Sequence, residues 1–391
     1  MTEFERNQEE LRKLLDLNQQ YWLLGAGVSY ESNIPLMYQL TYRVDQLLEG
    51  RDSELFSLVV EQLPEGSHVE HVLTHLGDLV AISRRVRTGT ARLGNEECTE
   101  ADLINAYQAI IEAIGVTVRY GYRRGQNGEA DLVGQSGSSI VKIEHHVAFL
   151  SALFDNRSNL ETRSNISFFT TNYDTLLEDA LALKRRVPID GFNGSAIGFW
   201  DPSEFDERIG RSQTNLCPVY KLHGSVDWVN DATYGLVRCR YDVDYLSSKK
   251  NLLIYPQATK YIETQKDPFA YLFSQFRASL ASPSAHLLAV AGYSFGDDHI
   301  NNEIDLALQS YGSKTNLVAF SKEVNGADGV TCLPPTLERW RNDPRMNTRV
   351  YVASDKALYW GSKRFQPSDG GQLGWWSFSG LTKFLDSGEA Q

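Results

Sequence analysis

The sequence predicts an α/β fold in which a Rossmann-like parallel sheet is flanked by helices and carries a helical insertion subdomain. Three short apolar runs, Tyr21 to Leu24, Ile166 to Thr171 and Val219 to Leu222, are typical of buried strands. Helices are expected from Met37 to Leu48 and from Thr175 to Lys184. Each apolar run ends in a motif of glycine or polar residues, and ligands of open α/β sheets gather at the carboxyl ends of the strands. These three motifs therefore form the candidate functional site.

The first motif is the turn Leu23-Leu24-Gly25-Ala26-Gly27-Val28-Ser29. Two glycines one residue apart let the backbone turn tightly against a phosphate, and Ser29 adds a hydroxyl at the mouth of the turn. Backbone N–H groups at the start of the helix from Met37 are then expected to face an anion. A Gly-Ala-Gly turn after a strand is also an ordinary tight connection, so this motif alone leaves both interpretations open.

The second and third motifs place an amide, a carboxylate and an imidazole at neighbouring strand ends. Asn172 and Asp174 follow the second apolar run, where the next helix begins. Both residue types also cap helices, because their side chains accept hydrogen bonds from the first free N–H groups. His223 follows the third run beside Gly224, and an imidazole there accepts a proton near neutral pH. A single histidine is more often a packing residue, but the neighbouring amide and carboxylate favour a catalytic role.

In this order, the motifs resemble those of the sirtuin superfamily, namely Gly-Ala-Gly-x-Ser, x-x-Asn-x-Asp and His-Gly. The resemblance continues at His286 to Ser294, which is similar to the sirtuin strand and Gly-x-Ser turn that hold the adenosine half of NAD. Leu317 to Ser321 is similar to the following strand, whose end lies near the adenine ribose. The resemblance covers about residues 18–325 as islands, and the stretch at about 50–160 matches nothing specific.

The chain departs from the protein-deacylating branch of this superfamily. Deacylases normally hold a structural zinc with two Cys-x-x-Cys pairs, whereas the cysteines here stand alone at positions 98, 217, 239 and 332. Asn33 also replaces the usual glycine before Ile34-Pro35, and we expect the turn to survive because asparagine tolerates positive φ better than most residues. The chain resembles the zinc-less sirtuin-like NAD hydrolases of bacterial anti-phage defence systems.

Residues 1–391 are expected to form a single sirtuin-like NAD-binding domain, with a helical insertion at about 50–160 and a C-terminal extension at about 335–391. Apolar residues at spacings of three and four predict helices within the insertion, over 52–63, 68–86 and 100–114. These helices either cover the nucleotide pocket or build an oligomer interface. The extension is rich in aromatic residues that we expect to pack back onto the fold, namely Trp360, Trp375, Trp376 and Phe378.

Composition favours one sizeable cytoplasmic enzyme. A chain of 391 residues with 42% apolar residues can bury an α/β core and one subdomain. The net charge of −12 argues against extensive binding to nucleic acid, which depends on clustered Lys and Arg. No apolar stretch is long enough to cross a bilayer, and isolated cysteines fit a reducing compartment. Histidines 68, 71 and 75 share helical spacing, but no fourth ligand accompanies them and we expect no metal site.

The resemblance implies that NAD is the substrate and that no resident cofactor is needed. Cleavage of the nicotinamide–ribose bond gives nicotinamide and an ADP-ribose product, with Asn172 orienting the ribose or the attacking water and His223 accepting a proton. Asp174 then fixes the loop or the nicotinamide. The remaining NAD-binding residues that the resemblance implies are Gly25, Ala26, Gly27 and Ser29 for the pyrophosphate, and Gly292, Ser294 and Ser321 for the adenosine half.

The family also implies a biological setting and leaves two alternatives. The expected protein is a regulated, NAD-depleting effector of abortive infection, a homo-oligomer gated by assembly or by a separately encoded HerA-type DNA-translocating ATPase. The chain has no Walker-type phosphate loop of its own. A protein deacylase would use Asn172 and His223 on an acyl-lysine, but the missing zinc pairs count against it. A non-catalytic module would bind ADP-ribose or another nucleotide, but retention of both residues counts against that function.

Overall fold

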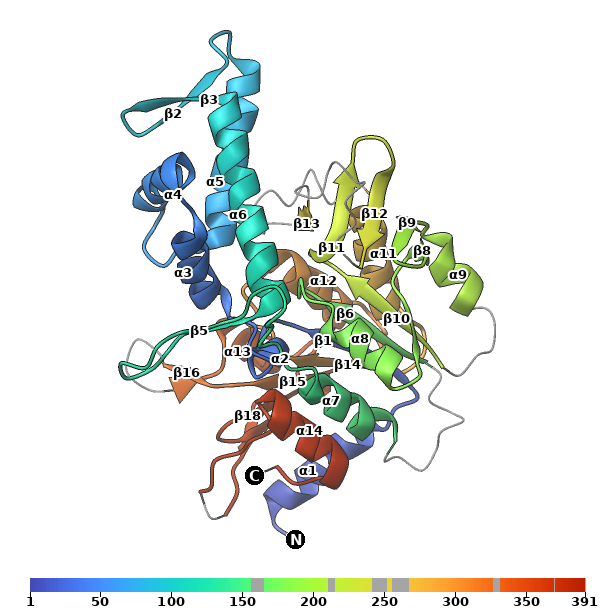
Figure 1. Ribbon diagram of the computed structural model, residues 1–391. Helices are drawn as coiled ribbons and strands as arrows, with labels where there is room; N and C mark the ends of the chain where they lie inside the picture. Colours follow the sequence, from blue (N-terminus) through green and yellow to red (C-terminus); the bar gives the residue numbers. More distant parts are fainter. Residues whose placement is uncertain are drawn as a thin grey trace.

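A nine-stranded, mostly parallel sheet is the largest element of the computed structural model, which describes residues 1–155, 165–209, 215–240, 252–254, 267–325, 331–368 and 370–390 (Figure 1). Neighbouring strands from β18 to β7 run parallel, and β19 and β20 are antiparallel additions at one edge. The strands that the sequence predicts are all present, so the predicted α/β class is confirmed. Across the sheet the order is β20 (Lys363–Phe365), β19 (Leu358–Trp360), β18 (Val350–Ser354), β15 (Thr315–Ser321), β14 (His286–Ala291), β1 (Gln19–Leu24), β6 (Asn165–Thr170), β10 (Leu216–Lys221) and β7 (Val187–Ile189).

The direction in which strands are added reverses between β1 and β14. From β1 the chain adds β6 and then β10 on one side, whereas from β14 it adds β15 and then β18 on the other. In open α/β sheets, ligands bind outside the carboxyl ends of the strands at such a switch point. The loops that leave the sheet there carry the glycines of the first motif and Gly292. The topology therefore brings together segments that are far apart in the sequence.

Helices cover both faces of this sheet, which explains the continuous apolar run from Tyr21 to Leu24 in β1. Trp22 and Leu24 face one hydrophobic core, and Tyr21 and Leu23 face the other, as expected for a parallel strand buried on both sides. The first core contains residues of α1 (Glu3–Leu15), α7 (Glu144–Phe154), α8 (Leu176–Leu183) and α14 (Phe378–Ser387). The second contains residues of α11 (Phe269–Leu280), α12 (Asp298–Gln309) and α13 (Pro335–Asn342).

The aromatic C-terminal segment packs back onto the sheet, as the sequence predicts. Trp375 and Phe378 are buried in the first core, and Trp360 packs against it. The Phe4 and Trp375 rings lie 6.0 Å apart, which joins the two ends of the chain. Gln8 Nε2 also donates to the carbonyl oxygen of Gly388 at 2.7 Å. Figure 1 accordingly shows both termini at the same end of the molecule.

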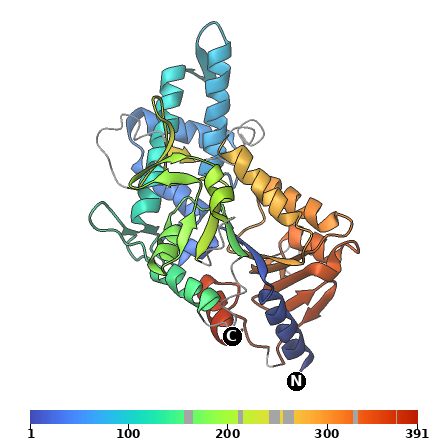
Figure 2. The ribbon, with the colours of Figure 1, turned by 90° about the vertical axis from the view of Figure 1, so that its right-hand side faces the viewer.

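A helical layer follows the first motif and shares one hydrophobic core with a second, smaller sheet. Figures 1 and 2 place the long α5–α6 pair at the end of the molecule opposite the termini, with a β-hairpin near its tip. Helices lie where the sequence predicts them, except that residues 156–160 of the expected insertion fall outside the described ranges. The layer comprises α3 (Met37–Leu47), α4 (Gly50–Gln62), α5 (Val69–Arg85), β2 (Thr90–Leu93), β3 (Glu96–Thr99) and α6 (Glu100–Tyr120).

The smaller, five-stranded antiparallel sheet was not predicted as a whole, although partial alternation over Gly235 to Tyr245 and the run Asn251 to Tyr255 predict two of its strands; residues 241–251 and 255 lie outside the described ranges. Its strand β11 begins at Gly224, directly after His223, and its apolar residues Val226 and Val229 pack against the core of the helical layer. This places the helical layer beside the candidate site. In order across the sheet the strands are β13 (Leu252–Ile254), β11 (Gly224–Asp231), β12 (Gly235–Cys239), β9 (Ile197–Trp200) and β8 (Phe192–Gly194).

The remaining elements are short. They are α2 (Gly27–Tyr30), α9 (Ser203–Ile209), a 3-10 turn at Asn347–Arg349, and the paired strands β4 (Tyr122–Arg123) with β5 (Leu132–Val133) and β16 (Val324–Asn325) with β17 (Thr331–Cys332). Across the described residues, no helix combines the length and apolar content that crossing a bilayer requires. Within the same ranges, no three His, Cys, Asp or Glu side chains lie together as a candidate metal site.

Candidate active site

The glycines at the switch point hold two loops in direct backbone contact. The N–H of Gly25 donates to the carbonyl oxygen of Ala291 at 3.0 Å, and that of Gly27 donates to the carbonyl oxygen of Gly292 at 2.8 Å. A Cβ added to Gly27 would lie 2.7 Å from Gly292 Cα, and Gly292 itself has a φ of +63°. Glycine is therefore required here by close packing. Ala26 is exposed at the tip of the turn.

A short helix that sequence analysis missed lies between this turn and the predicted helix. A single helical turn, α2, begins at Gly27 and buries Ser29, and the predicted helix from Met37 is confirmed as α3. That N–H groups at the start of α3 face an anion stays a prediction. Asn33 has a φ of +64°, as its tolerance for positive φ predicts, and its Nδ2 donates to the carbonyl oxygen of Ile140 at 2.8 Å.

Asn172, Ser29 and Asp174 form one buried hydrogen-bonded chain at the carboxyl ends of β1 and β6. Asn172 Nδ2 donates to Ser29 Oγ at 3.0 Å, and Ser29 Oγ donates to Asp174 Oδ2 at 2.8 Å. Asp174 Oδ1 accepts from the N–H of Leu176 at 3.0 Å, so Asp174 also ties down the start of α8. Asp174 therefore bonds the start of α8, as the capping interpretation expects, and its other oxygen bonds Ser29. Its role toward a ligand stays a prediction.

The other end of the Asn172 side chain is buried but unsatisfied. Among the described residues, its Oδ1 accepts no hydrogen bond, although the residue is only 9% exposed. A buried carbonyl oxygen without a donor is costly, and such groups are rare in native structures. With Nδ2 held by Ser29, the amide orientation is fixed by its partner. Asn172 therefore presents a fixed acceptor that a hydroxyl or a water molecule can satisfy.

Lys221 joins the loop of the second motif to that of the third. This buried side chain lies one residue before Leu222-His223, and its Nζ donates to the carbonyl oxygen of Asp174. Its Nζ also lies 3.2 Å from Glu178 Oε1, with both side chains nearly inaccessible. Burial raises the pKa of Glu178, and the charge of Lys221 opposes that rise. The N–H of Val226 also donates to the carbonyl oxygen of Tyr173 at 2.9 Å, which is a further bond between the two motif loops.

His223 is buried and paired with a carboxylate that sequence analysis missed. His223 Nε2 lies 2.9 Å from Asp297 Oδ2, and the two side chains are 4% and 1% exposed. Asp297 follows β14 in the segment Ser294-Phe295-Gly296-Asp297-Asp298 and caps α12. One sequence signal could have indicated Asp297. It is a carboxylate in the loop after β14, and that loop already carries Gly292. The switch-point topology brings this carboxylate to the histidine.

The two serines expected to surround the adenosine half lie on the loops after β14 and at the end of β15. Ser294 is exposed, and its Oγ accepts from the N–H of Gly296 at 3.3 Å. Ser321 is the last residue of β15 and is 8% exposed, with its Oγ 3.4 Å from the carbonyl oxygen of Lys322. Both lie on the carboxyl side of the sheet with Gly292. Their role toward a ligand stays a prediction.

The helical layer contacts the second motif through a buried hydrogen bond. Tyr173 Oη, between Asn172 and Asp174, donates to Glu70 Oε1 on α5 at 2.5 Å. Both side chains are buried, and burial together with the neighbouring Glu70 raises the pKa of Tyr173. Glu70 was missed because a carboxylate on an amphipathic helix normally belongs to the solvated face. Its burial shows that α5 packs over the motif loop.

His146 is a buried side chain of α7 that lies near Asp174 of the second motif. Its Nδ1 is 3.4 Å from Ser32 Oγ, and its ring centre is 5.0 Å from that of Phe378 on α14. Burial lowers the pKa of His146 to about 4, while the nearby carboxylate of Asp174 opposes that change. The imidazole is therefore neutral at physiological pH, so it adds no positive charge to the site.

Comparisons with known proteins agree with part of the sequence-based resemblance. A family profile described as a SIR2-like domain matches residues 166–342, which run from β6 to the end of α13. A search of curated proteins found no match to the chain. One similar solved structure, that of Sir2Tm bound to a propionylated peptide, has 14% identity over 82% of this chain and 90% of the other, with a TM-score of 0.33. Asn172, His223 and Asp297 all lie within the segment that matches the SIR2-like domain, whereas Gly25 to Ser29 precede it.

Proposed function

We propose that this chain is an NAD hydrolase that cleaves the bond between nicotinamide and ribose. The observation that carries the proposal is the buried Asn172 amide, which is held at Nδ2 by Ser29 and presents an Oδ1 without a donor among the described residues. It stands on a loop bonded to the one that carries His223, at the carboxyl ends of parallel strands. The match of residues 166–342 to a SIR2-like domain supports the choice of NAD.

The chemistry needs few protein groups, because nicotinamide is already a cationic leaving group. The bond between the nicotinamide nitrogen and the ribose C1′ breaks with its electron pair going to the pyridine ring, which leaves an oxocarbenium-like sugar. A water oxygen then bonds to C1′ and loses a proton to His223, and the products are nicotinamide and ADP-ribose. Asn172 Oδ1 accepts a hydrogen bond from that water or from a ribose hydroxyl. Positioning and charge stabilisation are the tasks of such a site.

Regulation is part of the proposal, since uncontrolled loss of NAD would kill the host cell. We propose that the protein acts in the cytoplasm as an NAD-depleting effector of anti-phage defence, and that assembly into a homo-oligomer or a separately encoded HerA-type ATPase releases its activity. The buried contact between Glu70 and Tyr173 supports a route for such control. Through this contact, a movement of α5 reaches the loop that holds Asn172.

Nicotinamide release from NAD tests the proposal directly. We expect release by the wild-type protein, alone or with a co-encoded partner, and a loss of at least about 100-fold in Asn172→Ala and His223→Ala, the usual size of acid–base contributions. Asn342→Ala and His75→Ala, which change the same residue types elsewhere, serve as matched controls and should keep full activity. Release that requires an acetylated peptide would favour a deacylase instead. Binding of ADP-ribose without any turnover would favour a non-catalytic module.

A further inference from the structure

The contact between His223 and Asp297 goes beyond packing. Asp297 is 1% exposed, and its Oδ2 lies 2.9 Å from His223 Nε2. Its other oxygen, Oδ1, accepts from the N–H groups of His299 at 3.0 Å and Ile300 at 3.4 Å, which caps α12. A cap requires only one acceptor, and a serine or an asparagine would provide it equally well. The second oxygen, Oδ2, instead places negative charge beside the histidine.

The loop that carries Asp297 is held in place by its own hydrogen bonds. Phe295 has a φ of +59°, a conformation that a bulky residue adopts only when its surroundings impose it. The carbonyl oxygen of Phe295 accepts from Asn301 Nδ2 at 2.7 Å, and Tyr293 Oη donates to the carbonyl oxygen of Asp297 at 3.1 Å. Strained backbone of this kind is concentrated at functional sites. Here it fixes the carboxylate before any ligand binds.

We propose that Asp297 is a positioning residue that sets the tautomer of His223. With Asp297 Oδ2 at 2.9 Å, the carboxylate favours a proton on Nε2 of the neutral imidazole, so that the lone pair lies on Nδ1, which becomes its basic atom. When Nδ1 takes a proton from the attacking water, the buried carboxylate stabilises the resulting imidazolium without being protonated itself. This inference rests on the proposed NAD hydrolysis and adds a residue to it.

Asp297→Asn isolates this role from the structural one. The amide oxygen of asparagine can still cap α12, so the variant should fold with an unchanged melting temperature. Its Nδ2 would donate to Nε2 of His223, which moves the imidazole proton to Nδ1 and removes the lone pair that accepts the substrate's proton. We expect kcat for nicotinamide release to fall at least about 100-fold, with KM and the affinity for ADP-ribose changed less than about threefold. Asp298→Asn, the exposed neighbour, is the matched control and should keep wild-type kcat.

A second readout does not depend on turnover. Nitrogen-15 chemical shifts of the labelled imidazole, assigned by difference from His223→Gln, should report an Nε2–H tautomer in the wild type and an Nδ1–H tautomer in Asp297→Asn. Turnover that survives the tautomer change, or an unchanged tautomer, would overturn the role of Asp297 while leaving NAD hydrolysis intact. Wild-type protein that never releases nicotinamide would overturn the proposed function, and the tautomer measurement would still decide whether Asp297 sets the histidine. Loss of activity together with a lower melting temperature would assign Asp297 a structural role only.

Discussion

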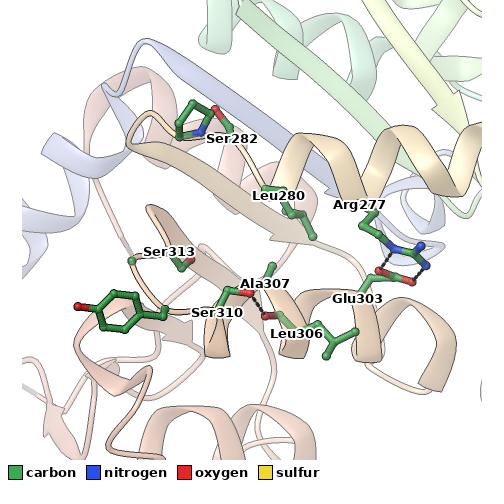
Figure 3. A pocket seen from close by; sticks show the side chains of 12 residues that line it. Arg277, Leu280, Ser282, Glu303, Leu306, Ala307, Ser310 and Ser313 are labelled. Carbon is green, nitrogen blue, oxygen red and sulfur yellow. Dashed lines mark hydrogen bonds and ion pairs between the residues drawn. The ribbon is translucent and has the colours of Figure 1, made fainter.

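The carboxyl edge of the large sheet, where its parallel strands end, differs from the amino edge, where they begin, and the difference separates the candidate active site from a cavity. At the carboxyl edge, Asn172, His223 and Asp297 are buried polar groups in contact with one another's loops. At the amino edge, the ends of α11 and α12 surround a cavity of about 340 Å³ (Figure 3). The helix α12 connects the two, since it starts at the site and ends at the cavity.

The amino-edge cavity offers little chemistry. Its charged side chains, Arg277 and Glu303, already form a bidentate ion pair that faces solvent on the Arg277 side (Figure 3). Ser310 Oγ donates to a backbone carbonyl oxygen, and Tyr311 is fully exposed. A large pocket is normally the default candidate for a ligand site. In this protein, we expect the buried Asn172 Oδ1, which accepts no hydrogen bond among the described residues, to be the better guide, because its burial must be compensated by something.

The largest effect is expected from disrupting the backbone contact between Gly27 and Gly292 at the carboxyl edge. In Gly27→Ala, the new Cβ would stand 2.7 Å from Gly292 Cα, so the two switch-point loops must separate. Overpacking against backbone of this kind destabilises the fold by about 3 kcal/mol, and turnover should fall with it. Gly296→Ala is the control, because its Cβ meets nothing nearer than Ser294 Oγ at 3.3 Å. Chemical denaturation measures the difference, and equal stability of the two variants would contradict the contact.

Acid should lower the free energy of unfolding through His146. The pKa of this buried imidazole is lowered to about 4, below its ordinary value of about 6.5, so the unfolded chain binds a proton that the folded chain does not. Stability from this group is complete above about pH 6.5 and is lost as the pH falls toward 4. The expected loss between pH 7 and pH 5 is about 2 kcal/mol. His146→Gln should remove that part of the pH dependence of the free energy of unfolding, and an unchanged slope would contradict it.

The sequence was sufficient for the strand-end motifs because their signals are local. A short apolar run followed by glycine, asparagine or histidine identifies a buried strand and its loop without knowledge of the rest. For the first motif, local signals left two interpretations open. The glycines looked like a phosphate turn, but the structure shows that they are also needed for contact with Gly292, a residue far along the chain.

Residues whose role depends on distant packing could not be predicted. Asp297 has the sequence features of a helix cap, and only the order of strands in the sheet brings it to His223. Glu70 has those of a solvated helix position until α5 is packed over Tyr173. In the five-stranded sheet, the partial alternation from Gly235 and the run Asn251 to Tyr255 indicate two strands, whereas strands as short as Phe192–Gly194 show too little alternation to be predicted.

The smallest effect is expected at the amino edge, where a substitution tests whether the cavity takes part in function. Arg277 is 67% exposed on its side of the pair with Glu303, and exposed ion pairs stabilise proteins by less than about 1 kcal/mol. Glu303 is 7% exposed, so Arg277→Ala is the cleaner change, because water can replace the lost partner while the carboxylate stays. Nicotinamide release should remain within about twofold of wild type, since α12 keeps its cap and Asp297 keeps its place. A large loss of turnover with unchanged thermal stability would show that the cavity takes part in function, and that burial alone does not separate the two edges.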